Sequence, residues 1–172
     1  ATRMRVVGRA NRQLREEIEE RSRTERRLAH EQYFLNALME NSPDIIYFKD
    51  ANGRFVRVNR TGAERFGFKS AAGMVGLSDF DLFSDEAARE FRHDEEFVMR
   101  TGSPIVAKEE REVTKAGKER WVQTTTMPFY DADQKVTGVI GISRDITKRK
   151  SAELELLRHR QLYEVMFNAM PA

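Results

Sequence analysis

Apolar residues near the N-terminus recur at a spacing that predicts one long helix. From Met4 to Met39 the chain has no proline, one glycine and mostly strong helix formers. In heptads counted from Met4 the a and d positions are largely apolar, and those expected to form a dimer seam are Val7, Asn11, Leu14, Ile18, Leu28 and Leu35. Residues 1–40 are therefore expected to form an amphipathic coiled-coil helix in a homodimer. A solvated helix that folds onto its own domain is the alternative.

The pattern changes after Pro43 to short alternating strands and glycines. Asn52-Gly53 lies between two apolar runs, which predicts a β-hairpin. Asn59 is placed to cap a short helix, and Ser84 to cap a longer one. Strands are expected at residues 45–48, 55–58, 105–113, 120–129 and 136–146. Together these elements predict one α+β domain over residues 41–147.

The two faces of the predicted sheet differ in character, because side chains alternate across a strand. In the last strand Val139, Gly141 and Ser143 share one face, and Ile140 and Ile142 share the other. The first face is small and mildly polar, and the second is large and apolar. The helices between the second and third strands can cover only one face. The other face is free for a flanking helix or a partner subunit.

The last strand passes into a helix over residues 148–172 with no turn residue at Asp145, Ile146 and Thr147. A helix joined to a sheet in this way is expected to be rigidly coupled to it and to pass on its movement. The apolar positions of residues 160–171 coincide with those of residues 32–43, and a proline ends both segments. This predicts that the C-terminal helix leads into a second copy of the same module.

Composition narrows the classes of function. The 172 residues are 40% hydrophobic and 34% charged, and no run reaches the roughly 18 apolar residues of a membrane span, so the fragment is expected to be soluble and cytoplasmic. The absence of cysteine excludes disulfides, thiolate metal sites and cysteinyl flavin adducts. A net charge of +2 argues against nucleic acid as a partner. The arginine-rich first 15 residues fit either a membrane anchor upstream in the full-length protein or a solvated helix end.

Four segments, in this order and spacing, resemble the PAS family of sensor domains. They are ENSPDIIYFKDANGRFVRVN at 40–59, GLSDFDLF at 76–83, TGSP at 101–104 and GVIGISRDIT at 138–147. The resemblance implies a five-stranded antiparallel sheet in the order 2-1-5-4-3, helices on one face, and long flanking helices that dimerise and carry signals. It also implies that Asp145, Ile146 and Thr147 are the signal-transfer motif, whose polar side chains fix the angle of the outgoing helix. Simple capping of free helix amides is the alternative role.

In PAS domains that bind a ligand, the pocket lies between the inner sheet face and the helices. The resemblance, together with Asp94 at the edge of the apolar stripe of the longer helix, gives the pocket candidates Tyr47, Asp94, Val122, Thr124, Thr126, Val139, Gly141 and Ser143. Their hydroxyl groups are suited to orienting a small polar molecule. A filled core whose hydroxyl groups bond to nearby backbone is the alternative, and Asp94 could equally cap a loop.

His93 lies on the helix where haem-binding members of the family carry a histidine. Helical spacing turns it away from the apolar stripe, which predicts an exposed imidazole. No haem, flavin, metal or other cofactor is therefore predicted, and a small-molecule ligand is left open.

The chain shows no nucleophile with a base, no phosphate-binding loop and no metal-ligand set, so no catalytic activity is predicted for it. The predicted function is a regulatory sensor and dimerisation module in a signal-transduction protein. Its output domain, a histidine kinase or a cyclic-dinucleotide enzyme, is expected in the same chain outside this fragment. A ligand-free dimerisation scaffold is the alternative, and a haem or small-molecule sensor that uses His93 or Asp94 is the third interpretation.

Overall fold

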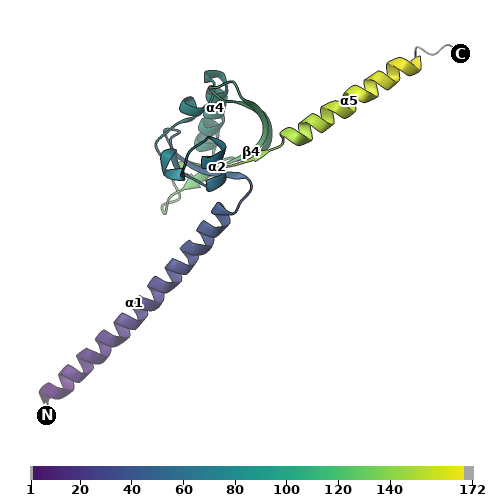
Figure 1. Cartoon of the computed structure of the whole chain (residues 1–172). Coiled ribbons are helices and arrows are strands. Elements are labelled where there is room, and N and C mark those ends of the chain that lie inside the picture. The colour runs from purple at the N-terminus through teal and green to yellow at the C-terminus, as the bar shows by residue number, and fades with distance from the viewer. Residues whose placement is uncertain (1, 169–172) are drawn as a thin grey trace. The chain divides into compact units, whose positions relative to one another are not determined.

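The structure is a computed structural model that describes the backbone of residues 2–168 and the side chains of residues 11–167. The chain divides into two compact units, Ala1–Asn41 and Ser42–Ala172. The first unit consists of helix α1 (Thr2–Glu40), drawn in purple and blue in Figure 1. Its ion pairs, such as Arg21 with Glu25, link side chains four residues apart along one helix. None of the described helices is long and apolar enough to cross a lipid bilayer.

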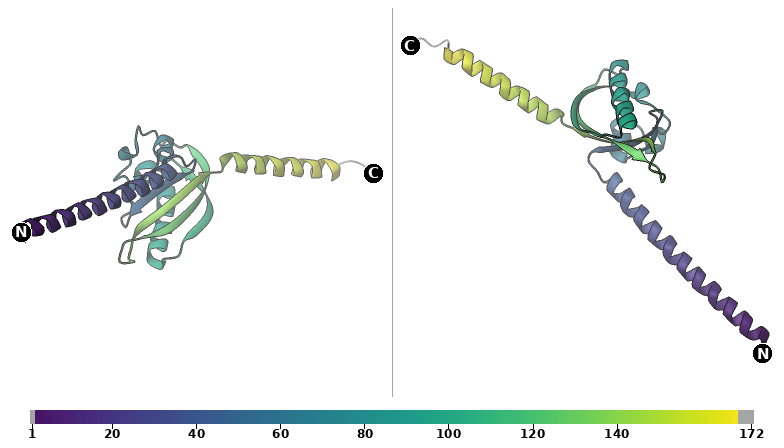
Figure 2. Two further views of the ribbon diagram at one scale, coloured as in Figure 1. Left: turned by 90° about the horizontal axis from the view of Figure 1, so that it is seen from below. Right: turned by 180° about the vertical axis from the view of Figure 1, so that it is seen from behind.

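The second unit is built on one five-stranded antiparallel sheet in the order β2-β1-β5-β4-β3. The strands are β1 (Ile45–Asp50), β2 (Phe55–Val58), β3 (Ile105–Val113), β4 (Glu119–Tyr130) and β5 (Val136–Asp145). The sheet curves, and the helices between β2 and β3 lie on its concave side (Figure 2). The predicted α+β fold class, strand order and one-sided helix layer are confirmed.

Between β2 and β3 the chain forms four helical segments, and a fifth helix follows β5. They are α2 (Arg60–Arg65), η1 (Ala71–Gly73), α3 (Asp79–Leu82), α4 (Asp85–Thr101) and α5 (Thr147–Asn168). Asn59 caps α2, since its side-chain oxygen accepts from the backbone N–H of Gly62 at 3.1 Å. The same oxygen accepts from the N–H of Ile46, which ties the start of α2 to β1. Ser84 caps α4 in the corresponding way through the N–H of Ala87.

The hairpin between β1 and β2 forms as predicted at Asn52-Gly53. Gly53 has φ of +75°, a conformation that residues with a Cβ atom rarely adopt. The turn is closed by hydrogen bonds from the N–H of Gly53 to the carbonyl of Asp50 and from the N–H of Asp50 to the carbonyl of Arg54.

Strand β3 contains one extra residue near its start. Ile105 pairs with Thr126, but Lys108 pairs with Thr124, so three steps along β3 match two steps along β4. This is a β-bulge, and Ala107 within it has a left-handed φ of +53°. The N–H of Ala107 donates to the side chain of Thr125 at 3.0 Å.

The bulge decides which side chains of β3 face the helices. Without it, the face of Ile105 would continue through Glu109 and Arg111. With it, the alternation shifts by one residue, and the inner face continues through Glu110 and Glu112. Two carboxylates consequently enter the space between sheet and helices, where the sequence pattern placed small hydroxyl and apolar groups.

Two apolar clusters close the space between the sheet and its helices. The first joins the inner face of β1 and β2 to the short helices through Ile45, Phe55, Val58, Ala63 and Met74. The second joins the start of α4 to the preceding segment through Phe83, Ala87 and Ala88. The two clusters share Phe66 and Leu82, which pack against both. Between them and the sheet lies a cavity with a polar lining.

Candidate functional site

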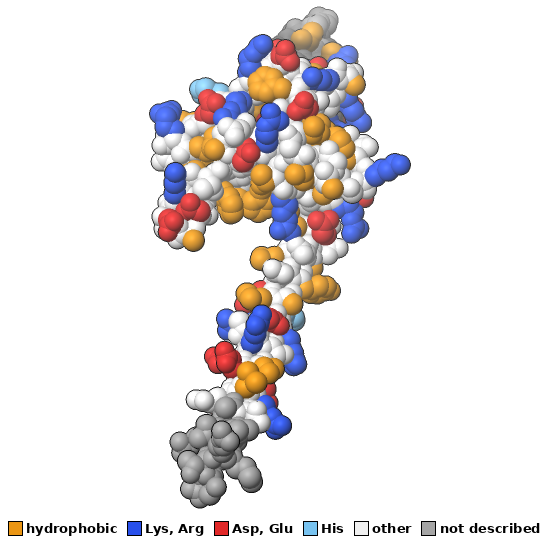
Figure 3. All heavy atoms as spheres, turned by 90° about the vertical axis from the view of Figure 1, so that its left-hand side faces the viewer, with side chains coloured by type: hydrophobic (Ala, Val, Ile, Leu, Met, Phe, Trp, Pro, Cys, Tyr) orange, Lys and Arg blue, Asp and Glu red, His pale blue; other side chains and the backbone are white. Residues whose placement is uncertain are grey.

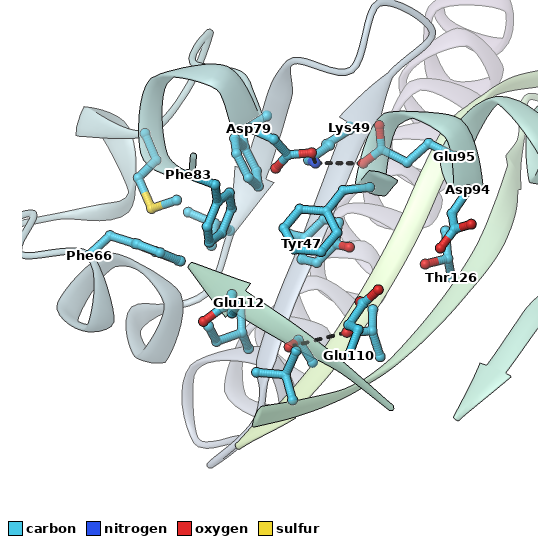
Figure 4. A pocket seen from close by; sticks show the side chains of 18 residues that line it. Tyr47, Lys49, Phe66, Asp79, Phe83, Asp94, Glu95, Glu110, Glu112 and Thr126 are labelled. Carbon is cyan, nitrogen blue, oxygen red and sulfur yellow. Dashed lines mark hydrogen bonds and ion pairs between the residues drawn. The ribbon is translucent and has the colours of Figure 1, made fainter. Parts of the chain in front are cut away.

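The cavity lies between the concave face of the sheet and helices α3 and α4 (Figure 4). Its volume is about 50 Å³, which is enough for a few water molecules or a small organic molecule. Aromatic rings and carboxylates dominate its lining. The aromatic residues are Tyr47, Phe55, Phe66, Phe83 and Phe91, and the carboxylates are Asp79, Asp94, Glu95, Glu110 and Glu112.

Six of the eight pocket residues predicted from the sequence line this cavity. They are Tyr47, Asp94, Val122, Thr124, Thr126 and Ser143. Thr124 and Ser143 are paired residues of β4 and β5, and their hydroxyl groups lie 3.5 Å apart. Whether any of them contacts a ligand stays a prediction.

The other two predicted pocket residues lie beneath the lining. Val139 is fully buried and is absent from the cavity wall. Gly141 lies directly under the ring of Tyr47, because a Cβ atom at this position would be 1.9 Å from Tyr47 Cζ. Gly141 therefore allows the tyrosine to lie flat across the sheet, which covers the glycine and directs the ring into the cavity.

A buried lysine is the strongest polar feature that the sequence interpretation missed. Lys49, on β1, is 2% exposed, and its ammonium group bonds to Asp79 of α3 and Glu95 of α4 at 2.5 Å each. It also lies 4.6 Å from the ring centroid of Phe55. The lysine thus holds both helices to the sheet by charge (Figure 4).

The pKa values of this group reflect burial and mutual charge. Burial alone would lower the pKa of Lys49, but Asp79 and Glu95 together raise it. Burial raises the pKa of Glu95, and Lys49 offsets only part of that effect. Burial also raises the pKa of the Tyr47 phenol well above its usual value, helped by the nearby carboxylates, so Tyr47 acts as a neutral hydroxyl group.

Glu110 and Glu112 form an acidic wall on β3 (Figure 4). They are 8% and 5% exposed. Burial raises the pKa of Glu110, and it raises the pKa of Glu112 to about 7 although Arg65 and Arg120 oppose the shift. Lys108 forms an ion pair with Oε2 of Glu110 at 3.3 Å, and its hydrogen bonds go to Asp94 at 2.5 Å and to Glu90 at 2.9 Å.

The α4 residues differ from the sequence interpretation in one respect. Asp94 lines the cavity as predicted, but it is paired with Lys108, and the neighbouring Glu95 is the more deeply buried of the two. His93 is exposed, as its helical position predicted. Among the described residues, no group of three or more histidine or acidic side chains is arranged to hold a metal ion.

The junction of β5 and α5 is fixed by side-chain bonds on both sides. The carboxylate of Asp145 accepts from the N–H of Thr147 at 2.9 Å, which caps the first turn of α5. The hydroxyl oxygen of Thr147 accepts from the N–H of Trp121 at 3.1 Å, and the N–H of Ile146 donates to the Trp121 carbonyl at 2.9 Å. Asp145 thus caps α5, as the capping role predicted, and Thr147 anchors the junction to β4. The signal-transfer role of Asp145, Ile146 and Thr147 stays a prediction.

The first turn of α5 is also held by charge. Arg149 and Lys150 both pair with Glu109, on the outer side of β3, and Lys150 lies 5.3 Å from the ring centroid of Trp121. Because Glu109 neighbours Glu110 in sequence, one strand carries both the acidic wall of the cavity and the anchor of the outgoing helix.

Arg65 connects the cavity to the junction. Its guanidinium is 10% exposed and lies 4.0 Å from Glu112 and 3.4 Å from Asp145. The Nη1 atom of Arg65 has no hydrogen-bond partner in the protein, and neither has Oε2 of Glu112. Burial would raise the pKa of Asp145, but the bonds from Thr147 and the charges of Arg65 and Arg120 lower it. Asp145 is therefore a carboxylate at neutral pH.

The predicted dimer seam lies on α1. Asn11, Leu14, Ile18, Leu28 and Leu35 are exposed within the described chain, whereas the side chain of Val7 lies outside the described residues. Figure 3 shows apolar side chains that recur along this helix among charged ones. The predicted second module falls partly on residues 169–172, which also lie outside the described part.

The sheet order, the cavity between sheet and helices, and the capped strand-to-helix junction define a PAS domain. A protein-family model described as "PAS fold" matches residues 39–151, about two thirds of the chain. The chain belongs to the PAS family.

Curated relatives with sequence similarity include a histidine kinase and a sensor protein. The methanogenesis regulatory histidine kinase FilI of Methanothrix harundinacea is 34% identical over 136 residues, which cover 79% of this chain and 15% of FilI. The virulence sensor protein BvgS of Bordetella bronchiseptica is 31% identical over 147 residues, which cover 84% of this chain and 12% of BvgS. The chain therefore spans only a small part of the length of these relatives.

A similar solved structure is a crystal structure of the Vibrio cholera VqmA–ligand–DNA complex. It superposes with a TM-score of 0.57 at 27% identity, over 64% of this chain and 49% of that one. Because that complex contains DNA, the prediction that this chain has no nucleic-acid partner stays a prediction.

Proposed function

We propose that this chain is a sensory and dimerising PAS module of a multidomain cytoplasmic signalling protein. Its cavity receives a small molecule, the β5–α5 junction relays occupancy to α5, and α5 carries the signal toward an output domain outside this chain. The names of FilI and BvgS, a histidine kinase and a sensor protein, support a histidine kinase as that output. The ligand in the VqmA complex supports a small-molecule role for the cavity.

The position of Arg65 carries this proposal. One buried guanidinium lies within 4.0 Å of both a cavity carboxylate, Glu112, and the carboxylate that caps α5, Asp145. A change in the charge or position of Glu112 alters the attraction on Arg65, and a shift of Arg65 alters the cap of α5. Cavity and outgoing helix are thereby coupled through a single side chain.

Substitution of Asp145 by alanine tests the relay. The loss of one cap should lower the free energy of unfolding by about 1 kcal/mol. The same substitution should speed amide hydrogen exchange in the first two turns of α5 and alter the output of the full-length protein. Asp133→Ala, an exposed aspartate in the β4–β5 turn, is the matched control. Unchanged exchange in α5 together with normal regulated output would refute the relay.

Dimerisation through α1 completes the proposal, because a PAS module that signals through helices needs a partner against which the helices move. The exposed apolar side chains at heptad spacing support this part. A ligand-free scaffold would keep the dimer but show no response to cavity occupancy, so exchange in α5 measured with and without a bound molecule separates the two functions.

A further inference from the structure

The acidic wall of the cavity has unused hydrogen-bonding capacity. Oε2 of Glu110, Oε2 of Glu112 and Oε2 of Glu95 are buried and accept no hydrogen bond from the protein. A buried polar atom left in this state is costly and rare in folded proteins. Glu110 and Glu112 are neighbours on one face of β3, so their free oxygens belong to one wall.

The cations near this wall form their short hydrogen bonds with other carboxylates. The ammonium group of Lys49 is enclosed by Asp79 and Glu95. That of Lys108 is hydrogen-bonded to Asp94 and Glu90, and it lies 3.3 Å from Oε2 of Glu110 as an ion pair. Arg65 approaches Glu112 no closer than 4.0 Å. The cavity lining holds five acidic side chains and one ammonium group, so its excess charge is negative at a pH where these acids have lost their protons.

The rest of the lining suits the apolar body of a small molecule. Rings of Tyr47, Phe55, Phe66, Phe83 and Phe91 surround the space. The faces of aromatic rings carry partial negative charge and attract cations, most strongly where water is excluded. Carboxylates bond to N–H donors of cations more strongly than to neutral donors. A wall of carboxylates opposite a set of rings is thus complementary to an organic cation.

The geometry points to a small organic cation, an alkylammonium or a guanidinium with a short apolar body, as the ligand of this cavity, bound by its N–H groups to Glu110 and Glu112. This inference rests on the proposed sensory function and specifies its ligand class. The cavity volume of about 50 Å³ limits the ligand to a few heavy atoms.

The acid–base behaviour of the wall supports this assignment. Groups that face Glu112 are Arg65 from α2, Arg120 from β4, Asp145 from β5 and Glu110 from β3 itself. With these neighbours the pKa of Glu112 is raised to about 7, so a cation must displace a proton from it below that pH. Binding should consequently strengthen as the pH rises from 6 to 8 and should release protons.

Calorimetric titration of the 172-residue chain tests the ligand class. The probes are methylammonium, n-butylammonium and methylguanidinium chlorides, and the matched controls are 1-butanol and sodium butyrate. Saturable binding of at least one cation, tighter by about 10-fold at pH 8 than at pH 6, is expected, with no binding of the alcohol or the anion. Absence of binding by all three cations, or equal binding of 1-butanol, would overturn the inference.

Two variants locate the site. Glu112→Gln and Glu110→Gln should each weaken cation binding by at least 10-fold, while Glu119→Gln, an exposed glutamate paired with Arg111 outside the cavity, should bind as the parent does. Two variants are used so that one remains informative if the other does not fold, as judged by circular dichroism. Equal affinity in a folded cavity variant and the parent would place the cation elsewhere and refute the site.

The ligand class and the relay can fail separately. Cation binding in the cavity without any change of hydrogen exchange in α5 would refute the relay and leave the ligand class intact. Binding of a neutral molecule that does change hydrogen exchange in α5 would refute the ligand class and leave the relay intact.

Discussion

At the scale of the residue, Lys49 is the side chain on which the arrangement of the site depends most. A buried ion pair adds little over a well-packed apolar pair, but removal of one partner leaves the other charge buried alone. Here a single ammonium group serves two buried carboxylates from two helices.

Lys49→Met should therefore destabilise the protein by about 3–5 kcal/mol at pH 7. The loss should shrink as the pH falls toward 5, because Glu95, whose pKa is already raised by burial, then binds a proton and no longer carries an unpaired charge. Urea unfolding at the two pH values measures both effects. Lys135→Met, at an exposed turn position, is the control. If Lys49→Met lowered the free energy of unfolding no more than the control does, the ion pairs of Lys49 with Asp79 and Glu95 would be dispensable for stability.

Glu112 makes a second prediction at this scale, because its pKa rises from 4.5 to about 7 on folding. The folded protein binds more protons than the unfolded chain between these pH values, so this residue lowers stability as the pH rises through that window. The free energy of unfolding falls by about 3 kcal/mol across this window. In Glu112→Gln this part of the pH dependence should disappear, making the variant more stable than the parent at pH 8 and similar to it at pH 4. Glu119→Gln should keep the parent's slope, and an unchanged slope in Glu112→Gln would contradict the assignment.

At the scale of the element, sequence patterns predicted the helices and strands closely, because caps, the Asn-Gly turn and alternation are local signals. Asn59, Ser84 and Gly53 act as these signals indicated. The joint at Asp145 and Thr147 was likewise visible in the absence of a turn residue. Its contacts with Arg65 and Trp121 join residues distant in sequence, so local sequence patterns could not predict them.

The site itself was predicted only in part. Hydroxyl groups on β4 and β5 were found because these strands alternate regularly, whereas the acids of β3 were missed because the bulge at Ala107 reverses their face without a glycine to mark it. Lys49 had a local signal, since it shares the face of Ile45 and Tyr47 on β1. Its burial was unforeseen because a lone lysine is rarely fully buried unless acids meet it from other elements.

At the scale of the whole molecule, the proposed function assigns receptor and lever to the unit from Ser42 onward and the association surface to α1. The chain matches less than a sixth of the length of FilI and of BvgS, so a module of this size is one part of such proteins. Sensing by the domain and association through the helices are separate properties, and each can be tested alone.

Leu14→Asp combined with Ile18→Asp should shift the chain from dimer to monomer, because two charges per helix would have to be buried in an apolar seam. Sedimentation velocity measures the mass. The matched control, Gln13→Asp with Arg23→Asp, adds acids at heptad positions away from the seam and should keep the dimer. A parent chain that is already monomeric, or a double variant of unchanged dimeric mass, would exclude the coiled coil.

The one-residue bulge in β3 has a consequence for how such a receptor can change its specificity. If β3 paired without the bulge but kept all its residues, Glu109 and Arg111 would turn inward and Glu110 and Glu112 outward, while the apolar clusters on β1, β2 and the helices kept their places. A substitution that removes the bulge without removing a residue could thus exchange an anionic binding surface for one that includes a guanidinium, which offers evolution a route to a different class of effector without rebuilding the scaffold.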